Sequence, residues 1–487
     1  MKDYIIAIDQ GTTSSKILLI NKKNEIVDKD YIEIGKQELP GGEILQNPIE
    51  ILLSVQELLN RLFERNNLDP KRIDSIAITN QRESTIIWNK KTGKPVYDVI
   101  SWQAYNTNYL TKEWVKKGYE RKVFDKTGLL INPYFSASKI KHILNNTNEN
   151  IEDLLFGTID TFLLWNLSVE KNHKTDISNA SRTMLFNIHD NKWDKELLED
   201  FEIPEAILPT VSNNNDLFGH YEYQGVKIPI QAMIGDQQSA LFGHLCVDNG
   251  DVKVTYGTGC FILTNIGDRP CQSKSGLLTT VAWKLDEKVI YALEGSVFMG
   301  GSAVRWMRDK LNLVNNVDDS ELMAYGSKND NVYVVPAFVG LGAPYWDNDI
   351  KASILGLEAN TTKADIMKAT LNSIAYQVTD ILEIIKKETN TSIKSIAVDG
   401  GASNNNYLMQ FQSDLINVKL LQNTESEITG LGSAFISGLK TGFFESINEI
   451  RKNQKIKKIF IPTSNQKRVV DLYERWKLAV KATQLFK

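Results

Sequence analysis

The chain has 487 residues, of which 42% are hydrophobic and 24% charged, and its formal net charge is −4. Such a composition is typical of a globular protein with more than one core, and the balanced charge argues against nucleic-acid and anionic-membrane partners. No apolar run is long enough for a membrane span. The three cysteines lack framework spacing, which argues against a zinc site and predicts a reducing, cytoplasmic location.

The first predicted element is a hairpin over Ile5–Ile20, in which residues 11–14 form a Gly-Thr-Thr-Ser turn between two apolar strands. Glycine permits positive φ there, and exposed N–H groups together with hydroxyls form a nest for phosphate. Asp9 ends the first strand. It either orients a magnesium ion through water or caps the turn, and a second phosphate turn in the chain favours the metal role.

A helix is predicted over Pro48–Phe63 from its apolar spacing, followed by strands over Ile73–Thr79 and Val96–Ile100. Arg82 and Glu83 follow the first of these strands and offer a donor fork beside an acceptor, which suits the hydroxyl groups of a polyol. A solvated surface pair is the alternative.

Trp102 follows the second of these strands, and Tyr134 belongs to the Asn-Pro-Tyr-Phe corner at residues 132–135. Each aromatic ring either walls a small-molecule pocket or packs in the core. Further along, Asp236 follows the apolar strand Ile228–Ile234. Its carboxylate either receives the proton of a substrate hydroxyl during phosphoryl transfer or serves as the N-cap of a helix over Gln237–Phe242.

A second hairpin over Val252–Thr264 repeats the design of the first, with a Gly-Thr-Gly turn at residues 257–259. Two such hairpins predict two similar lobes that close on one nucleotide, in an α/β architecture. We expect the lobe boundary near residues 244–249. A helix over Ala364–Ile385, a strand and glycine pair over Val398–Asn406, and a last helix from about Asn465 to Leu485 complete the predicted elements.

Several sequence blocks carry a family resemblance, among them AIDQGTTSSK at 7–16, ITNQRES at 78–84, NPYFSASK at 132–139, GDQQSALFG at 235–243, YGTGCF at 256–261 and DGGASNNNYLMQFQSD at 399–414. They resemble the glycerol kinases of the FGGY carbohydrate kinase family, within the actin/Hsp70-like ATPase superfamily. The resemblance implies two actin-like (ribonuclease H-like) lobes, 1–246 and 247–487, each a mixed sheet flanked by helices, with a cleft between them. It also implies ATP-dependent phosphorylation of glycerol to sn-glycerol 3-phosphate in glycerol catabolism, with ATP and Mg²⁺ as cofactors.

The resemblance also assigns roles to individual residues, with Asp236 as the catalytic base and Asp9 and Asp236 near magnesium. The residues implied to hold glycerol are Arg82, Glu83, Trp102, Tyr134, Asp236, Gln237 and Phe261. The residues implied to hold the nucleotide are Thr12, Thr13, Ser14, Lys16, Thr258, Gly301, Arg305, Gly401 and Asn405. Lys16 and Arg305 depart from the family pattern, which has Arg and Gln at these positions. We expect a homo-oligomer, either a dimer or a tetramer.

Two other functions are consistent with parts of this pattern. A kinase for another polyol or sugar would share the lobes, although the Arg82-Glu83 and Pro133-Tyr134 pairs favour glycerol. An ATP-driven switch resembling actin would share both phosphate turns but would leave the second, polar and aromatic cluster unexplained. Hydrolysis of ATP without any polyol would be its signature.

Overall fold

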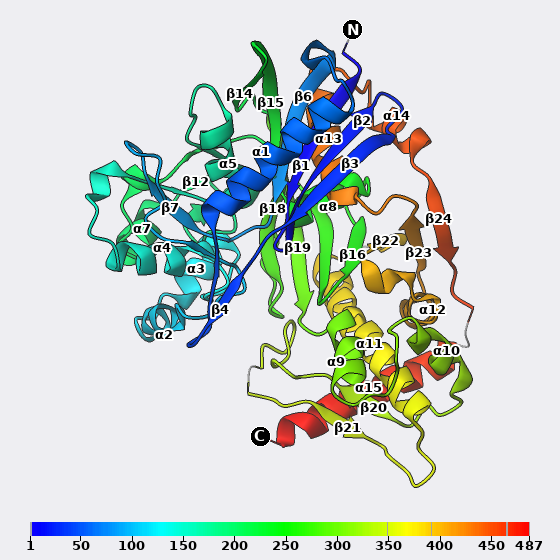
Figure 1. Ribbon diagram of the computed structural model, residues 1–487. Helices are drawn as coiled ribbons and strands as arrows, with labels where there is room; N and C mark the ends of the chain where they lie inside the picture. Colours follow the sequence, from blue (N-terminus) through cyan, green and yellow to red (C-terminus); the bar gives the residue numbers. More distant parts are fainter. Residues whose placement is uncertain (1, 348, 391, 464–465, 487) are drawn as a thin grey trace.

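The computed structural model of the chain describes residues 2–347, 349–390, 392–463 and 466–486. Two large mixed sheets follow one another through the molecule, and helices flank both of them (Figure 1). The structure is therefore the predicted α/β fold with two halves. Among the described residues, no helix is both long and apolar enough to cross a membrane.

The first sheet contains the first predicted hairpin and has the strand order β14-β15-β6-β1-β2-β3. β1 and β15 each run parallel to β6, so the carboxyl ends of these three strands meet at one edge. Asp9, the segment after residue 80 and Asp236 are brought together at this edge. The strands are β1 (Tyr4–Gln10), β2 (Ser14–Asn21), β3 (Ile26–Glu33), β6 (Ile73–Asn80), β14 (Gly219–Tyr223) and β15 (Val226–Gly235).

The second sheet contains the second predicted hairpin and has the order β18-β19-β17-β16-β22-β23-β24. β16 and β22 are parallel, with Thr255 opposite Asp399, so the second phosphate turn lies beside the glycine pair at 400–401. The strands are β16 (Val252–Tyr256), β17 (Cys260–Gly267), β18 (Leu278–Leu285), β19 (Lys288–Val297), β22 (Ser395–Asp399), β23 (Lys419–Asn423) and β24 (Ile456–Phe460).

The helices follow the capping and spacing rules that predicted them. In α1, Asn47 caps two backbone N–H groups and Pro48 occupies the first turn, while Ile51 and Leu58 are buried. The helices are α1 (Pro48–Arg65), α2 (Asn108–Lys116), α3 (Glu120–Thr127), α4 (Ser136–Asn145), α5 (Ile159–Leu167), α6 (Ile177–Ala180), α7 (Lys195–Asp200), α8 (Asp236–Gly243), α9 (Gly301–Asp309), α10 (Asp319–Gly326), α11 (Lys363–Thr389), α12 (Asn406–Ile416), α13 (Ile428–Thr441), α14 (Ile447–Asn453) and α15 (Gln466–Leu485).

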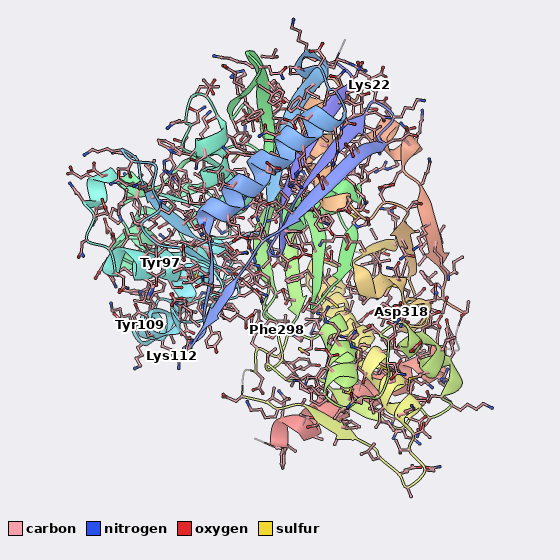
Figure 2. The ribbon with its side chains drawn as sticks, viewed as in Figure 1. Lys22, Tyr97, Tyr109, Lys112, Phe298 and Asp318 are labelled. Carbon is pink, nitrogen blue, oxygen red and sulfur yellow. The ribbon has the colours of Figure 1, made fainter. Side chains whose placement is uncertain are left out.

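Short strands and several of these helices form an outer region beside the first sheet. Tyr97, Tyr109 and Lys112 mark this region in Figure 2, whereas Asp318 lies on the far side of the molecule. The short strands of this region are β4 (Gln37–Leu39), β5 (Glu43–Gln46), β7 (Ile86–Asn89), β8 (Val99–Ile100), β9 (Leu154–Gly157), β10 (Lys174–Asp176), β11 (Phe186–Asn187), β12 (Lys192–Trp193) and β13 (Thr210–Ser212). Two further short strands, β20 (Tyr333–Val335) and β21 (Ser353–Leu355), pair with each other in the second half, where β20 packs against α11 and α15. The 3₁₀ turns span Pro70–Arg72, Ile151–Asp153, Glu205–Ile207 and Gly401–Asn404.

Helices α8 and α13 cross between the two sheets at very short range. A Cβ atom on Gly432 would lie 1.9 Å from the Ser239 carbonyl oxygen, and one on Gly243 would lie 2.3 Å from the Ile428 oxygen. Gly430 faces Leu18 of the first sheet. Glycine at these positions therefore allows the two helix backbones to touch, and α13 packs on the first sheet although it comes late in the sequence.

Most of the predicted elements are confirmed, with boundaries shifted by a few residues. Both hairpins, the helices over Pro48–Phe63 and Ala364–Ile385 and the strand–glycine–helix segment after Val398 are present. The strand predicted over Val96–Ile100 is wrong in extent, because only Val99–Ile100 pairs, against β5. The last helix is confirmed, while the start predicted at Asn465 lies outside the described residues.

Candidate active site

The two predicted phosphate turns have the same tight geometry. The Gly11 N–H donates to the Ser14 carbonyl at 2.9 Å, and the Gly257 N–H donates to the Gly259 carbonyl at 2.9 Å. Thr13 and Thr258, one in each turn, are exposed. Each turn therefore presents hydroxyl and backbone groups to an anion without a packed side chain over it.

The nucleotide residues predicted in the second half gather around the second turn. The Gly301 N–H, at the start of α9, donates to the Gly257 carbonyl at 2.8 Å, and Arg305 Nη2 donates to Thr258 Oγ1 at 2.9 Å. Gly400 has φ of 85°, and a Cβ on it would lie 2.5 Å from the Tyr256 oxygen. Only glycine fits this approach, which places Gly401 beside the turn.

Asn405 lies at the start of α12, where its side-chain oxygen caps the Leu408 N–H at 2.9 Å. Its side-chain nitrogen donates to Ser320 Oγ at 3.2 Å. The amide is thus already engaged within the fold, four residues after Gly401.

The predicted metal residues lie at the carboxyl ends of β1 and β15, the two strands on either side of β6 in the first sheet. Burial, opposed by Lys16 and reinforced by Asp236 and Glu427, raises the pKa of Asp9 to about 7. Among the described residues no cluster of three or more His, Cys, Asp or Glu side chains forms a metal cage. Magnesium commonly uses one or two carboxylates together with waters and substrate phosphates, so Asp9 and Asp236 fit this ion.

Lys16 extends from the first turn toward the second half of the chain. Its ammonium lies 2.9 Å from the Glu427 carboxylate at the start of α13, and Lys29 lies 3.3 Å from the same group. Burial opposes the charge of Lys16, but Glu427 outweighs it and raises the pKa of Lys16. Glu427 thus fixes the positively charged Lys16 side chain beside the first turn.

Arg82 and Glu83 are 2% and 1% exposed, so the alternative of a solvated surface pair is wrong. Glu294 of β19 accepts two hydrogen bonds from Arg82, at 2.7 and 3.1 Å, and one from Arg182 at 2.9 Å. Arg182 Nε donates to Glu83 at 2.6 Å. Burial acts to raise the pKa of Glu294, but the two guanidinium groups overcome it and lower this pKa to about 2.

Three predicted aromatic rings form one wall next to these charges. The Trp102 ring lies edge to face with Tyr134, at 5.6 Å between centroids, and with Phe261 at 6.4 Å. Tyr134 is held by Lys139, whose ammonium donates to the backbone oxygens of residues 133, 134 and 135 at 2.8, 2.6 and 3.1 Å. Burial lowers the pKa of Lys139 to about 7.

Asp236 is the first residue of α8, and Gly235 rather than Asp236 precedes the helix as its cap residue. The Asp236 carboxylate remains 28% exposed and lies 3.4 Å from Arg82 Nε. Burial raises the pKa of Asp236, while Arg82 and Lys253 oppose this rise. Gln237 beside it accepts a hydrogen bond from Lys253 Nζ at 2.6 Å.

The structure thus brings the polyol residues together at the edge of the first sheet, next to both predicted metal residues. Sequence reasoning missed Arg182, Lys253 and Glu294 as part of this cluster. A signal for two of them was present, because Lys253 and Glu294 are charges flanked by apolar residues within strands. Arg182 lies in a loop segment without such a contrast.

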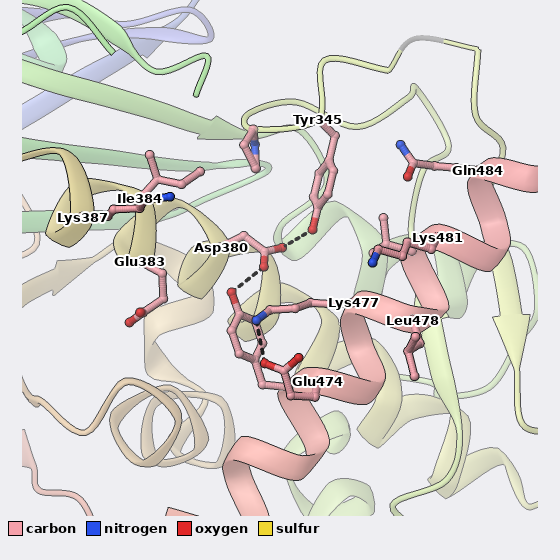
Figure 3. Close-up of a pocket in the computed structure, with 13 residues that line it drawn as sticks. Tyr345, Asp380, Glu383, Ile384, Lys387, Glu474, Lys477, Leu478, Lys481 and Gln484 are labelled. Carbon is pink, nitrogen blue, oxygen red and sulfur yellow. Dashed lines mark hydrogen bonds and ion pairs between the residues drawn. The ribbon is translucent and has the colours of Figure 1, made fainter. Parts of the chain in front are cut away.

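A separate surface pocket of about 630 Å³ lies between α11 and α15 (Figure 3). Its central Asp380 accepts hydrogen bonds from the Tyr345 and Tyr473 hydroxyls at 2.8 and 2.6 Å. Lys477 pairs with Glu474 at 2.7 Å. These polar groups form hydrogen bonds and an ion pair with one another, and none of the predicted site residues lines this pocket. The candidate active site is therefore the cluster around Arg82 and Asp236, not this pocket.

Comparison with known proteins agrees with this geometry. The N-terminal domain of the FGGY family of carbohydrate kinases matches residues 4–243, and its C-terminal domain matches residues 252–440. A glycerol kinase of Streptococcus pneumoniae serotype 19F (strain G54) is 46% identical over 492 residues, covering 99% of this chain and 98% of that protein.

Solved structures give the same result. The structure of Plasmodium falciparum glycerol kinase with ADP has a TM-score of 0.93 and 33% identity, covering 99% of this chain and 98% of that one. A ligand-bound xylulose kinase from Lactobacillus acidophilus has a TM-score of 0.88 at 22% identity, covering 98% of each chain, which shows the shared fold alone. The chain belongs to the FGGY family of carbohydrate kinases.

Proposed function

We propose that the chain transfers the γ-phosphoryl group of ATP to glycerol and so forms sn-glycerol 3-phosphate, as expected for glycerol catabolism. The observation that carries this proposal is the juxtaposition of a small polyol-type cluster with a phosphate turn. Trp102, in the aromatic wall, donates from Nε1 to Thr12 Oγ1 at 2.9 Å. The 46% identity to a glycerol kinase over nearly the whole chain supports the same acceptor.

The buried charges suit a three-carbon triol. Arg82, Glu83 and Gln237 offer both donors and acceptors, while Trp102, Tyr134 and Phe261 enclose the apolar edge of the molecule. Glycerol is small and carries a hydroxyl on every carbon, so a compact site with fixed polar groups recognises it better than a wide one.

Asp236 is the group that aims the attacking hydroxyl and receives its proton. Phosphoryl transfer proceeds through a loose transition state, so the carboxylate mainly orients the nucleophile and needs no strongly raised pKa. Asp9 and Asp236 would hold magnesium together with the phosphates, and the ion would supply positive charge beside the transferred group. Exclusion of water by the two halves prevents hydrolysis of ATP.

The nucleotide is held from both halves. Thr12, Thr13, Ser14 and Lys16 grip the terminal phosphates from the first turn. The groups assigned to the nucleotide from the second half are Thr258, Gly301, Arg305, Gly401 and Asn405. The contacts of Gly301 and Arg305 with the second turn support this assignment.

Three further features belong to the proposal. The first lobe comprises residues 1–246 and the second comprises 247–487, consistent with the gap between the two family matches. The protein acts in the cytoplasm, in keeping with its three free cysteines. It assembles as a homodimer or homotetramer, which light scattering on the purified protein would measure.

A substrate panel tests the function directly. Coupled ADP release is measured with glycerol, xylulose, gluconate and no acceptor. Glycerol is expected to give the highest kcat/KM by at least tenfold. Highest activity with a sugar would assign another kinase activity, and equal ADP release without any acceptor would assign an ATP-driven switch.

A further inference from the structure

Lys253 is a buried charge with no place in the functions assigned above. It lies on β16 between Val252 and Val254 and is 0% exposed. Its ammonium donates to Gln237 Oε1 at 2.6 Å and to Thr255 Oγ1 at 2.9 Å. Burial of an ammonium group costs free energy unless the group is paired and hydrogen-bonded. The two hydrogen bonds of Lys253 therefore indicate a specific role for this residue.

The surroundings of Lys253 come from both halves of the molecule. The charged groups that act on it are Asp399 of β22, Asp236 of α8, Arg82 and Glu294. Burial lowers the pKa of Lys253, while Asp399 and Asp236 oppose this by favouring the ammonium form. Asp399 also accepts a hydrogen bond from His244 Nε2 at 2.7 Å. The ammonium therefore lies at the meeting point of the polyol cluster and the second sheet.

β16 continues directly into the second phosphate turn at residues 257–259. Lys253 thus connects the strand that presents the nucleotide turn with Gln237, which is adjacent in sequence to the proposed base. Gln237 is partly exposed, and its amide would otherwise be free to rotate between rotamers. With Oε1 held by Lys253, the Gln237 amide is fixed beside Asp236, and a side-chain hydrogen bond from Gln237 helps to oppose the rise in the pKa of Asp236.

We propose that Lys253 is a positioning residue for the acceptor substrate: it reaches across from the second half and fixes the Gln237 amide in its glycerol-binding orientation. This inference rests on the proposed function. The alternative is that Lys253 only neutralises Asp399 in the core, in which case its loss would lower stability without a selective effect on glycerol.

The test uses a double-mutant cycle on the full chain with Lys253→Met and Gln237→Ala. Lys253→Met is expected to raise the KM for glycerol about tenfold, because one hydrogen bond to a charged group is lost. The KM for ATP is expected to stay within about twofold. Lys253→Met in the Gln237→Ala background is expected to add less than about twofold, because Lys253 acts through Gln237. Lys253→Arg is expected to recover part of the glycerol affinity.

Lys368 provides a matched control. It is another buried lysine, 5% exposed, lies near the start of α11 and pairs with Asp330 at 2.8 Å. Lys368→Met is expected to lower the melting temperature without changing the KM for glycerol. Isothermal titration of glycerol into each folded variant separates binding from turnover.

Additive effects in the cycle, or equal increases in both KM values, would overturn the inference. If Lys253→Met does not fold, Lys253→Gln replaces it, because Gln removes the charge but keeps a hydrogen-bond donor. An unchanged glycerol affinity in Lys253→Gln, together with an additive cycle, would overturn the inference. Failure of the proposed function is distinguished by the unmodified chain, which would then show no glycerol-dependent ADP release.

Discussion

The indole N–H of Trp102 donates to the hydroxyl of Thr12 at 2.9 Å. This contact joins the aromatic wall of the polyol cluster to the first phosphate turn. Trp102 also packs against Tyr134, in the first half of the chain, and against Phe261 on β17 of the second sheet. One side chain therefore contacts both halves of the molecule. We therefore expect glycerol bound at the proposed site to change the environment of this indole.

Trp102 is accordingly expected to report glycerol binding. Glycerol should change the intrinsic fluorescence of the unmodified protein, and the change should disappear in Trp102→Phe, which keeps an aromatic ring but removes the fluorescent indole and its N–H donor. The other eight tryptophans provide the background signal. An unchanged glycerol response in Trp102→Phe would remove this residue from the pocket.

Asp236→Asn tests the proposed base. The amide cannot accept the hydroxyl proton, so kcat is expected to fall about 10²- to 10⁴-fold. Binding of ATP without magnesium, measured by calorimetry, should change little because the nucleotide residues lie elsewhere. Turnover near that of the unmodified protein would refute the role of Asp236.

Arg305→Gln tests the nucleotide contact in the second turn. Loss of the guanidinium removes the donor to Thr258 and a positive charge, so the KM for ATP is expected to rise about three- to tenfold. The KM for glycerol should stay constant, and added salt should reduce the difference.

Arg308 offers a control one turn later on the same helix, where it pairs with Asp309 at 2.6 Å. Arg308→Gln removes the same charge without touching the turn and should leave the KM for ATP unchanged. An equal effect of both variants would indicate a general change in surface charge.

Gly432→Ala tests the close crossing of α8 and α13. The added Cβ would meet the Ser239 carbonyl at 1.9 Å, and neither backbone can move aside, so the free energy of unfolding is expected to fall by about 1–3 kcal/mol. Gly326→Ala is the control, because no atom lies within 4 Å of its added Cβ. Denaturation in urea would compare them, and equal midpoints would contradict the backbone contact.

His173 makes stability depend on pH. Burial lowers its pKa to about 4, and its ring nitrogen lies 2.7 Å from the Phe156 carbonyl. Between pH 6.5 and 4 the unfolded chain binds a proton that the folded chain does not, so this contribution is complete above pH 6.5 and is lost on acidification. It amounts to at most about 3 kcal/mol.

His173→Gln should remove that part of the pH dependence. The free energy of unfolding would be measured in urea at pH 7, 6 and 5 for both proteins. The unmodified protein is expected to lose more stability than the variant across this range. Parallel losses would show that another group titrates.

The two hairpins were predictable because each has a local signal, apolar strands around a glycine turn. The edge where Asp9, Arg82 and Asp236 meet was also predictable, since parallel strands align their carboxyl ends. The partners of Arg82 were not, because Glu294 lies 212 positions later on another sheet and only the fold brings them together. The strand predicted over Val96–Ile100 was too long, because an apolar run does not show at which residue its pairing with another strand begins.

The position of α13 has a consequence for how the polypeptide can be divided. A fragment ending at Cys246 would lack α13 and would present the apolar face around Ala7 and Leu18 to water. Such a fragment is expected to aggregate when expressed alone and to be rescued by co-expression of the remainder. Residues from both halves of the sequence thus form one shared hydrophobic core.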